Sequence, residues 1–247
     1  MKNMKTLYLD LSMGAAGDML TAALLELVPD RQKIIDKLNN LGIPGVEFVL
    51  ENAQKCGITG SHMSVLIYGE EESDHHSHNG LHDIEHIVSH FTGVPSFIKK
   101  QILQVYNHIA QAESQVHGEP VNEIHFHEVG TLDAIADVTA VCMLMNEVNA
   151  DIILASPIHV GSGTVKCAHG ILPVPAPATA VLLEGMPFYS EDIKGELCTP
   201  TGAALLKFFV DQFVEKAPLL KNTIVGHGMG KKDFTRPNCV TAILGEQ

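Results

Sequence analysis

The stretch TLYLDLSMGAAGDMLTAALLEL, residues 6–27, decides the fold prediction because its pattern changes from strand to helix across one short turn. Residues 6–11 are typical of a strand, and residues 18–27 are typical of a helix. Residues 12–18 between them are expected to form a glycine-containing turn. The chain therefore begins with both kinds of element, and its fold class must accommodate sheet and helix together.

Outward from this stretch, helices and strands are predicted to alternate irregularly. Helix starts and stops are marked by proline, glycine and capping residues. The predicted helices are 31–41, 81–91, 95–116, 131–148, 177–185 and 200–214. The predicted strands are 46–52, 62–68, 151–160 and 241–244, with an extended segment at 121–129. This irregular order favours an α+β (mixed α/β) fold, with a mixed sheet packed against several helices, over a strict doubly wound sheet.

The composition is that of a folded protein with one large domain or two modest ones. The 247 residues are 45% hydrophobic and 18% charged, which supplies a buried core and is unlike a disordered chain. The formal net charge of −13 argues against a nucleic-acid or anionic membrane surface, because both require clustered Lys and Arg. A single phosphate can still bind locally, so a nucleotide ligand remains open.

The sequence shows no features of secretion or membrane insertion. Asp10 and Asp18 interrupt the first apolar run, so no signal peptide is expected. No stretch reaches the roughly 18 apolar residues of a membrane span. The five cysteines contain no CxxC pair, which indicates neither a disulfide framework nor a thiolate zinc site. We expect a cytoplasmic protein in a reducing compartment.

The composition changes abruptly at residues 70–80. This segment has no apolar residue and contains His75, His76 and His78, which is typical of a mobile loop that recruits metal or is simply solvated. We treat residues 1–247 as one region, which this loop subdivides if any boundary exists.

The strongest local signal for chemistry is His125-Phe126-His127-Glu128. In an extended segment alternate side chains share a face, so His125 and His127 can hold one ion while Phe126 faces the core. The chain has 14 histidines, and neutral imidazole binds nickel, zinc, copper or iron. The ligand type therefore predicts a transition metal without selecting which one.

Asp133 and Asp137 lie one turn apart on the helix that follows, so they share a face. Asp137 has apolar neighbours, and a carboxylate in such surroundings is costly to bury unless it is paired, hydrogen-bonded or coordinating. The alternative is a capping Asp133 and a solvent-facing Asp137. The sequence leaves both interpretations open.

The turn that contains Gly14 and Gly17 is a candidate phosphate site. A glycine-bearing turn that opens a helix offers free backbone N–H groups and the positive end of the helix dipole. It lacks the spacing and the lysine of a P-loop. Asp10 and Asp18 flank the turn and are candidates for metal ligands, a base or helix caps.

Two further groups of residues are weaker signals. His82, His86 and His90 are spaced by four, so a helix places them on one face, where they either buffer metal or form a wet surface. No direct catalytic role is expected for them. Cys167 and His169 could bind a soft metal, although such a pair is more often structural.

These segments together resemble the LarC family of nickel insertion proteins. The matching segments fall in order along nearly the whole chain, which makes the resemblance specific. They are GDM at 17–19, the His-rich loop, AQAESQVHG at 110–118, EIHFHEVG at 123–130, Asp133 with Asp137, CAHGILPVPAPAT at 167–179, TPTGAA at 199–204, and residues 226–230.

The resemblance implies a nickel chelatase (cyclometallase) of the lyase class. Its substrate would be pyridinium-3,5-bisthiocarboxylic acid mononucleotide, which receives Ni(II) through two Ni–S bonds and one Ni–C bond. The family consumes CTP with a divalent cation such as manganese or magnesium, and its product is the nickel-pincer cofactor of lactate racemase.

The chain departs from the family pattern in places. Met13 and Ala15 stand where small or β-branched residues are expected, Ala134 where Ser is usual, and Cys239-Val240 lacks an expected Arg. Family members also continue into a second domain that binds CTP and manganese. We therefore expect this chain to correspond to the first half, with the second half as its partner. A homo-oligomer is a further open possibility.

The roles that we assign combine residue chemistry with this resemblance. His125, His127 and Glu128 are predicted to hold nickel, and Asp18, Asp133 or Asp137 to act as the base that a new Ni–C bond requires. Two alternatives remain: a nickel chaperone or store centred on the His-rich region, and a metal-dependent hydrolase that activates water.

Overall fold

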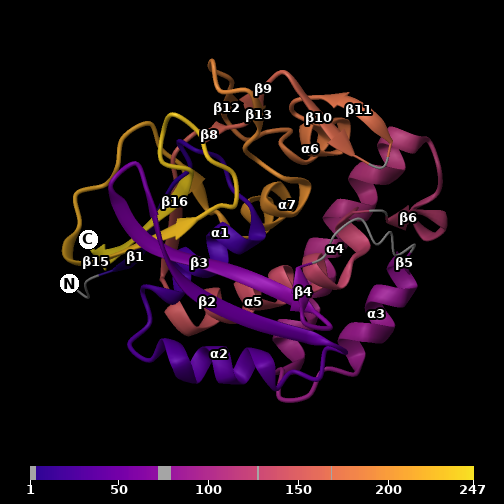
Figure 1. Ribbon diagram of the computed structural model, residues 1–247, viewed down its shortest axis with the longest axis horizontal. Helices are drawn as coiled ribbons and strands as arrows, with labels where there is room; N and C mark the ends of the chain where they lie inside the picture. Colours follow the sequence, from indigo (N-terminus) through magenta and orange to yellow (C-terminus); the bar gives the residue numbers. More distant parts are fainter. Residues whose placement is uncertain (1–3, 72–78, 127, 168) are drawn as a thin grey trace.

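A mixed sheet forms the centre of the protein in the computed structural model, which describes residues 4–71, 79–126, 128–167 and 169–247. The first strand, β1 (Lys5–Asp10), lies between two strands from distant parts of the chain (Figure 1). It runs parallel to β7 (Ile152–Ala155) and antiparallel to β16 (Cys239–Glu246). All four inner residues of β1 are buried, as expected for a strand covered on both faces.

The remaining strands extend the sheet on both sides of this centre. β14 (Gln212–Phe213) pairs with β7 in parallel, and β15 (Lys221–Met229) pairs antiparallel with β16. β15 continues to the hairpin of β2 (Val46–Lys55) and β3 (Ile58–Ile67) through one parallel pair, and β4 (Glu70–Glu71) pairs with β3. The sheet order is β14-β7-β1-β16-β15-β3-β2. The predicted mixed sheet is confirmed.

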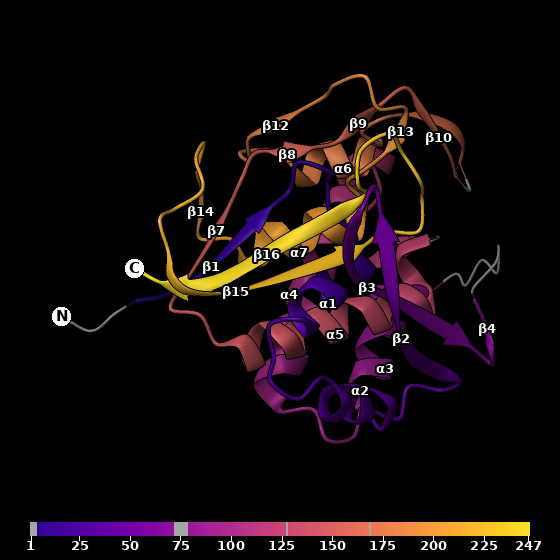
Figure 2. The same ribbon diagram turned by 60° about the vertical axis from the view of Figure 1, so that its left-hand side comes forward.

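Helix α1 (Gly17–Leu25) lies against this sheet (Figure 2), and all of its residues except Asp18 are buried. It packs on β15 and on α5 (Leu132–Val148). Its backbone approaches the sheet very closely: a Cβ on Gly228 of β15 would lie 1.9 Å from the carbonyl oxygen of Met19. This close approach requires glycine in β15.

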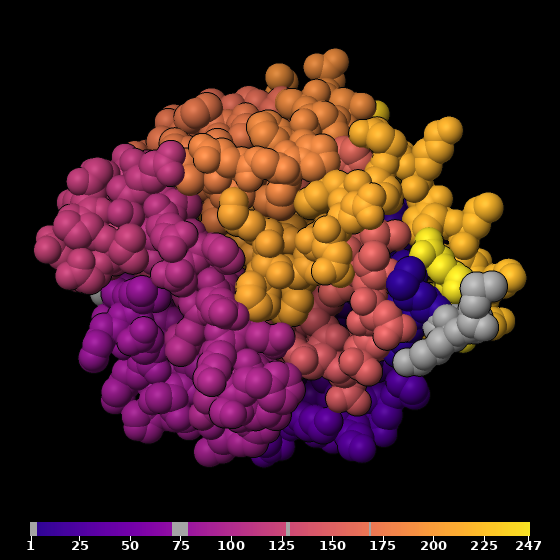
Figure 3. Space-filling model, turned by 180° about the vertical axis from the view of Figure 1, so that it is seen from behind, coloured from indigo at the N-terminus to yellow at the C-terminus, as the bar shows by residue number. Residues whose placement is uncertain are grey.

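The other helices surround α1 and α5. They are α2 (Arg31–Asn39), α3 (Leu81–Ser89), α4 (Ser96–His117), α6 (Pro177–Leu182) and α7 (Pro200–Phe209). On the back of the molecule, the magenta segment that carries α3 and α4 lies beside the orange segment that carries α6 and α7 (Figure 3). An apolar stripe along α4 is buried from Ile98 to Ala112, but Val116 at its end is 38% exposed. No helix in the described ranges is long and apolar enough to cross a membrane.

Four short strand pairs lie outside the main sheet in the described residues. β8 (Ile158–His159) pairs with β12 (Phe188–Tyr189), and β9 (Gly161–Ser162) with β13 (Gly195–Glu196). β10 (Thr164–Cys167) forms a hairpin with β11 (Gly170–Pro173), and β5 (Asn79–Gly80) pairs with β6 (His125–Phe126).

Several predicted boundaries were wrong. The strand predicted at 151–160 is two strands, because the chain breaks at Pro157 between β7 and β8. The segment predicted as extended at 121–129 contains two 3₁₀ turns, at Val121–Glu123 and Glu128–Gly130, and only β6 is a strand. The helix predicted to reach residue 214 ends at Phe209. The predicted loop at 70–80 lies mostly outside the described residues.

Candidate functional site

A cavity with a volume of about 300 Å³ opens where three helices begin. The first residues of α1, α5 and α7 line it, together with Met63 and Val65 of β3 and the loop between β15 and β16. This volume is at the lower end of the range for small-molecule sites. The three helix starts come from residues 17, 132 and 200, so the site is assembled from distant parts of the sequence.

The starts of α1 and α7 are joined through their backbones. Ala15 N–H donates to the Leu197 carbonyl at 3.1 Å, and Thr199 N–H donates to the Ala15 carbonyl at 3.0 Å. Gly14 has a φ of +78°, and a Cβ there would lie 2.1 Å from the Leu197 oxygen. Gly14 does not line the cavity, so packing accounts for this glycine, and its predicted role at a phosphate stays a prediction.

Asp137 is a buried acid of the cavity with a strongly raised pKa. Burial raises its pKa well above the usual range, and the nearby charges of Asp133 and Asp18 raise it further. Its Oδ1 atom is buried and has no hydrogen-bond partner among the described residues. Gly17 lies directly against this carboxyl group, since a Cβ on Gly17 would be 2.5 Å from Asp137 Oδ2. The solvent-facing interpretation of Asp137 is therefore wrong.

Asp18 lies in the first turn of α1 and lines the same cavity. Burial raises its pKa, while a hydrogen bond from Met19 N–H to its Oδ1 at 2.8 Å, and the charges of His62 and Lys231, oppose the increase. The imidazole Nδ1 of His62 lies 2.7 Å from the Met229 carbonyl. A protonated Asp18 or Asp137 is a proton donor, and either one is a base or metal ligand once ionised.

Asp133 completes a group of three carboxylates in one cavity. It lies in the first turn of α5, but the side chain of Thr131, and not of Asp133, caps that helix by accepting from Ala134 N–H at 3.3 Å. The charge of Asp133 raises the pKa of the buried Tyr106 hydroxyl, after burial and the charge of Asp137. The three aspartates that were predicted as alternative bases thus line one cavity, and their roles stay predictions.

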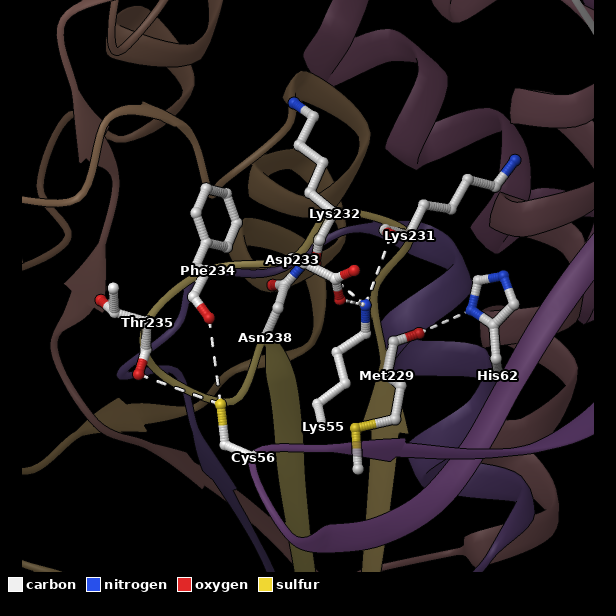
Figure 4. Close-up of polar contacts among 10 residues, drawn as sticks. All are labelled: Lys55, Cys56, His62, Met229, Lys231, Lys232, Asp233, Phe234, Thr235 and Asn238. Atoms are coloured by element: carbon white, nitrogen blue, oxygen red, sulfur yellow. Dashed lines mark hydrogen bonds and ion pairs between the residues drawn. The ribbon is translucent and has the colours of Figure 1, made fainter.

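Lys231 and Lys232 bring positive charge to the cavity from the loop between β15 and β16. Lys55, at the end of β2, holds this loop through its ammonium group (Figure 4). Its Nζ donates to the carbonyls of Lys231 at 3.3 Å and Lys232 at 3.0 Å, and lies 2.6 Å from Asp233 Oδ1. The hairpin tip therefore fixes the loop that carries both lysines.

The predicted histidine site is only partly described. Phe126 is 1% exposed, as predicted, and His125 is exposed and does not line the cavity. His127 and the side chain of Glu128 lie outside the described part of the structure. Among the residues that are described, no three His, Cys, Asp or Glu side chains have the spacing of a preformed metal site. The assignment of His125, His127 and Glu128 stays a prediction.

The histidines of α3 form a surface feature. His82, His86 and the capping residue His90 are exposed, and the His86 and His90 rings lie 4.4 Å apart. His90 Nδ1 is 2.8 Å from the His86 carbonyl. His75, His76 and His78 lie outside the described residues.

Sequence reasoning missed His62, Lys231 and Tyr106. The β15–β16 loop follows a glycine-rich strand that was not predicted, so nothing indicated where Lys231 would lie. Tyr106 could have been found as a polar group on the otherwise apolar stripe of α4, where it is fully buried.

Comparisons with known proteins agree on one family. A family model described as "Nickel insertion protein" matches residues 7–247. Proteins named "Pyridinium-3,5-bisthiocarboxylic acid mononucleotide nickel insertion protein" are 39% identical in Desulfitobacterium hafniense over 98% of this chain and 36% identical in Geobacillus kaustophilus over 99% of it. The chain covers 59% and 60% of those relatives, respectively. No solved structure matches.

Proposed function

The chain belongs to the nickel insertion protein family, and we propose that it inserts Ni(II) into pyridinium-3,5-bisthiocarboxylic acid mononucleotide in the cavity of Asp18, Asp133 and Asp137. The observation that carries this proposal is the buried Asp137 carboxyl group. Its Oδ1 lacks a partner among the described residues, and an unpartnered buried carboxylate is costly unless a ligand or proton satisfies it.

The three aspartates suit a metal that must be transferred. Carboxylate oxygens bind Ni(II) less tightly than thiolates do, so the two thiocarboxylate groups of the substrate can take the ion from them. Formation of the Ni–C bond releases the proton of the ring carbon. Asp137, whose pKa is raised by burial and by neighbouring carboxylates, is the base that we propose to accept it.

The lysines suit the other end of the substrate. The mononucleotide carries a phosphate, and Lys231 and Lys232 line the cavity. A phosphate near these lysines and the start of α7 would combine two ammonium charges with the positive end of a helix dipole. The N–H groups of Asp18 and Met19 at the start of α1 already bond to carboxylates, so the lysines are the better phosphate site.

CTP consumption completes the proposal. Because this chain covers about 60% of the relatives' length, we propose that CTP and its manganese or magnesium ion bind to the part of such a protein that lies beyond the match. That part would act as the partner of this chain. The cavity described here would then carry the metal-transfer step.

Mass spectrometry of the product tests the proposed function. The chain is incubated with Ni(II) and the mononucleotide, with and without CTP, manganese and the remaining segment of the Desulfitobacterium hafniense relative. We expect a nickel-bearing product from the parent and from Asp192→Asn, an exposed control, and at least a 100-fold loss in Asp137→Asn. Equal product from the Asp137 variant would refute the assignment. Nickel binding with no product under any condition would instead indicate a chaperone.

A further inference from the structure

A second cavity, of about 170 Å³, adjoins the carboxylate cavity. Glu196 and Pro200 line both cavities, so the two are neighbours. The second cavity lies between the C-terminal end of α4 and the β10–β11 hairpin, which are close together in Figure 1. The proposed function makes no use of this cavity.

Four potential metal donors line the second cavity. Glu113 and His117 lie one turn apart on α4, and His117 Nε2 is 3.4 Å from Glu113 Oε2. The His169 ring faces the His117 ring, with ring centres 5.0 Å apart. Cys167, at the end of β10, lines the same cavity. The donors thus come from two segments that are about 50 residues apart in the sequence.

Two of these separations, Glu113 to His117 and His117 to His169, equal those of a pair of ligands on one ion. Imidazole nitrogen and carboxylate oxygen lie about 2.1 Å from a divalent transition metal, so two such atoms on a tetrahedral ion are about 3.4 Å apart. Two imidazoles on the same ion have ring centres about 5 Å apart by the same geometry. A surface ion pair would account for Glu113 and His117 alone, but it would not explain why a second imidazole and a thiol lie beside them.

We propose that Glu113, His117, Cys167 and His169 form a loading site for Ni(II), from which the ion passes to the carboxylate cavity. Imidazole and thiol are better nickel ligands than carboxylates, so this site would capture the free ion first. No three donors among the described residues have the spacing of a preformed site, so Cys167 and the other donors must move closer together when the ion binds. The transfer role rests on the proposed function, whereas the binding of nickel does not.

The positions of the donor groups indicate the direction in which the nickel ion would move between the two cavities. The ion would move from imidazole and thiol ligands, past Glu196, to the substrate sulfurs in the neighbouring cavity. Glu196 is half-buried and lines both cavities, so it lies at the boundary between them. Nickel binding at Cys167 requires the thiolate, so the thiol proton is released to solvent when the ion binds.

Nickel titration of the chain, without substrate, tests the site. Thiolate-to-nickel absorption in the near ultraviolet is the readout, because the carboxylate cavity contains no thiol. All variants carry asparagine in place of His75, His76 and His78, so that the His-rich loop does not contribute. We expect His117→Ala and His169→Ala each to weaken nickel binding at least 10-fold, and Cys167→Ser to abolish the absorption band.

Matched controls come from elsewhere on the surface. His86→Ala replaces an exposed histidine on another helix, and Cys56→Ser replaces an exposed cysteine. Both should bind nickel like the parent. Parental affinity in either His117→Ala or His169→Ala would overturn the proposal.

X-ray absorption of the nickel-bound parent avoids the question of whether variants fold. We expect scattering from imidazole nitrogen and from one sulfur. A nickel environment of oxygen ligands alone would refute the loading site. It would leave the proposed insertion reaction standing, since product formation is measured separately.

Discussion

Replacing Asp137 by Asn should stabilise the fold while it removes activity. Burial and two neighbouring carboxylates raise the pKa of Asp137 well above its usual range. The residue is only 8% exposed. At neutral pH the folded protein therefore bears the cost of either a bound proton or a buried charge. Asn has the same shape, carries no charge and keeps an oxygen to accept the backbone hydrogen bond from Asp18.

The size of the effect follows from the linkage between pKa and stability. Each unit by which folding raises this pKa costs about 1.4 kcal/mol at a pH above both values. Partial relief of this cost in Asn should raise the free energy of unfolding at pH 7 by about 1–2 kcal/mol. For a chain of this length, that gain corresponds to about 2–8 °C in Tm.

The raised pKa also determines how the stability difference between Asp137→Asn and the parent changes with pH. Because the folded pKa of Asp137 lies above the unfolded value of about 3.9, protonated Asp137 contributes its full stability below pH ~4. That contribution is lost as the pH rises through the folded pKa. The advantage of Asp137→Asn should therefore be near zero at pH 4 and grow towards neutral pH.

Urea unfolding of the parent and Asp137→Asn from pH 4 to 8 measures this difference. Asp192→Asn, an exposed aspartate, is the matched control and should differ from the parent by less than about 0.5 kcal/mol at every pH. A variant that is no more stable than the parent at pH 7 would show that the Asp137 carboxyl group is not under strain from burial. An advantage that does not change with pH would contradict its titration.

Three further predictions concern the surroundings of this carboxyl group. Gly17→Ala places a Cβ 2.5 Å from Asp137 Oδ2, so it should cost about 1–3 kcal/mol in urea unfolding; Gly80→Ala, with its nearest atom at 3.4 Å, should not. Lys55→Met removes the hydrogen bonds to the β15–β16 loop and should speed hydrogen exchange in that loop. It should also raise the KM for the mononucleotide about 10-fold, a change of about 1.4 kcal/mol. The exposed ion-pair control Lys37→Met should do neither. Nickel insertion should become faster as the pH rises through the raised pKa of Asp137, because only the ionised form accepts a proton, and a pH-independent rate would exclude it as the base.

The sequence predicted the elements around the cavity well where their patterns are local. The change of period at residues 6–27 correctly placed β1 and α1, and Pro200 with its capping Thr199 correctly started α7. Strand β15 was not predicted because it is rich in glycine, which weakens a strand on its own. Glycine is required there because the backbone of α1 lies so close. Such a requirement exists only in the folded protein, so no local pattern could reveal it.

The candidate site was harder to predict than the fold. The sequence placed Asp133 and Asp137 on one helix face but left Asp18 apart from them, and only the packing of α1 on α5 brings all three into one cavity. Lys231 depends on an unpredicted loop that Lys55 holds from another part of the chain. In the second cavity, Cys167 and His169 gained significance only when α4 placed His117 beside them.

Nickel entry into the substrate at the carboxylate cavity competes with the untested prediction that His125, His127 and Glu128 hold the ion. Its most direct test compares the yield of nickel-bearing pyridinium product, by mass spectrometry, from Asp137→Asn and His125→Ala under identical conditions. We expect at least a 100-fold loss for the aspartate variant and a yield within about threefold of the parent for the histidine variant, since His125 does not line the cavity. The reverse result, with product lost in His125→Ala and retained in Asp137→Asn, would contradict it.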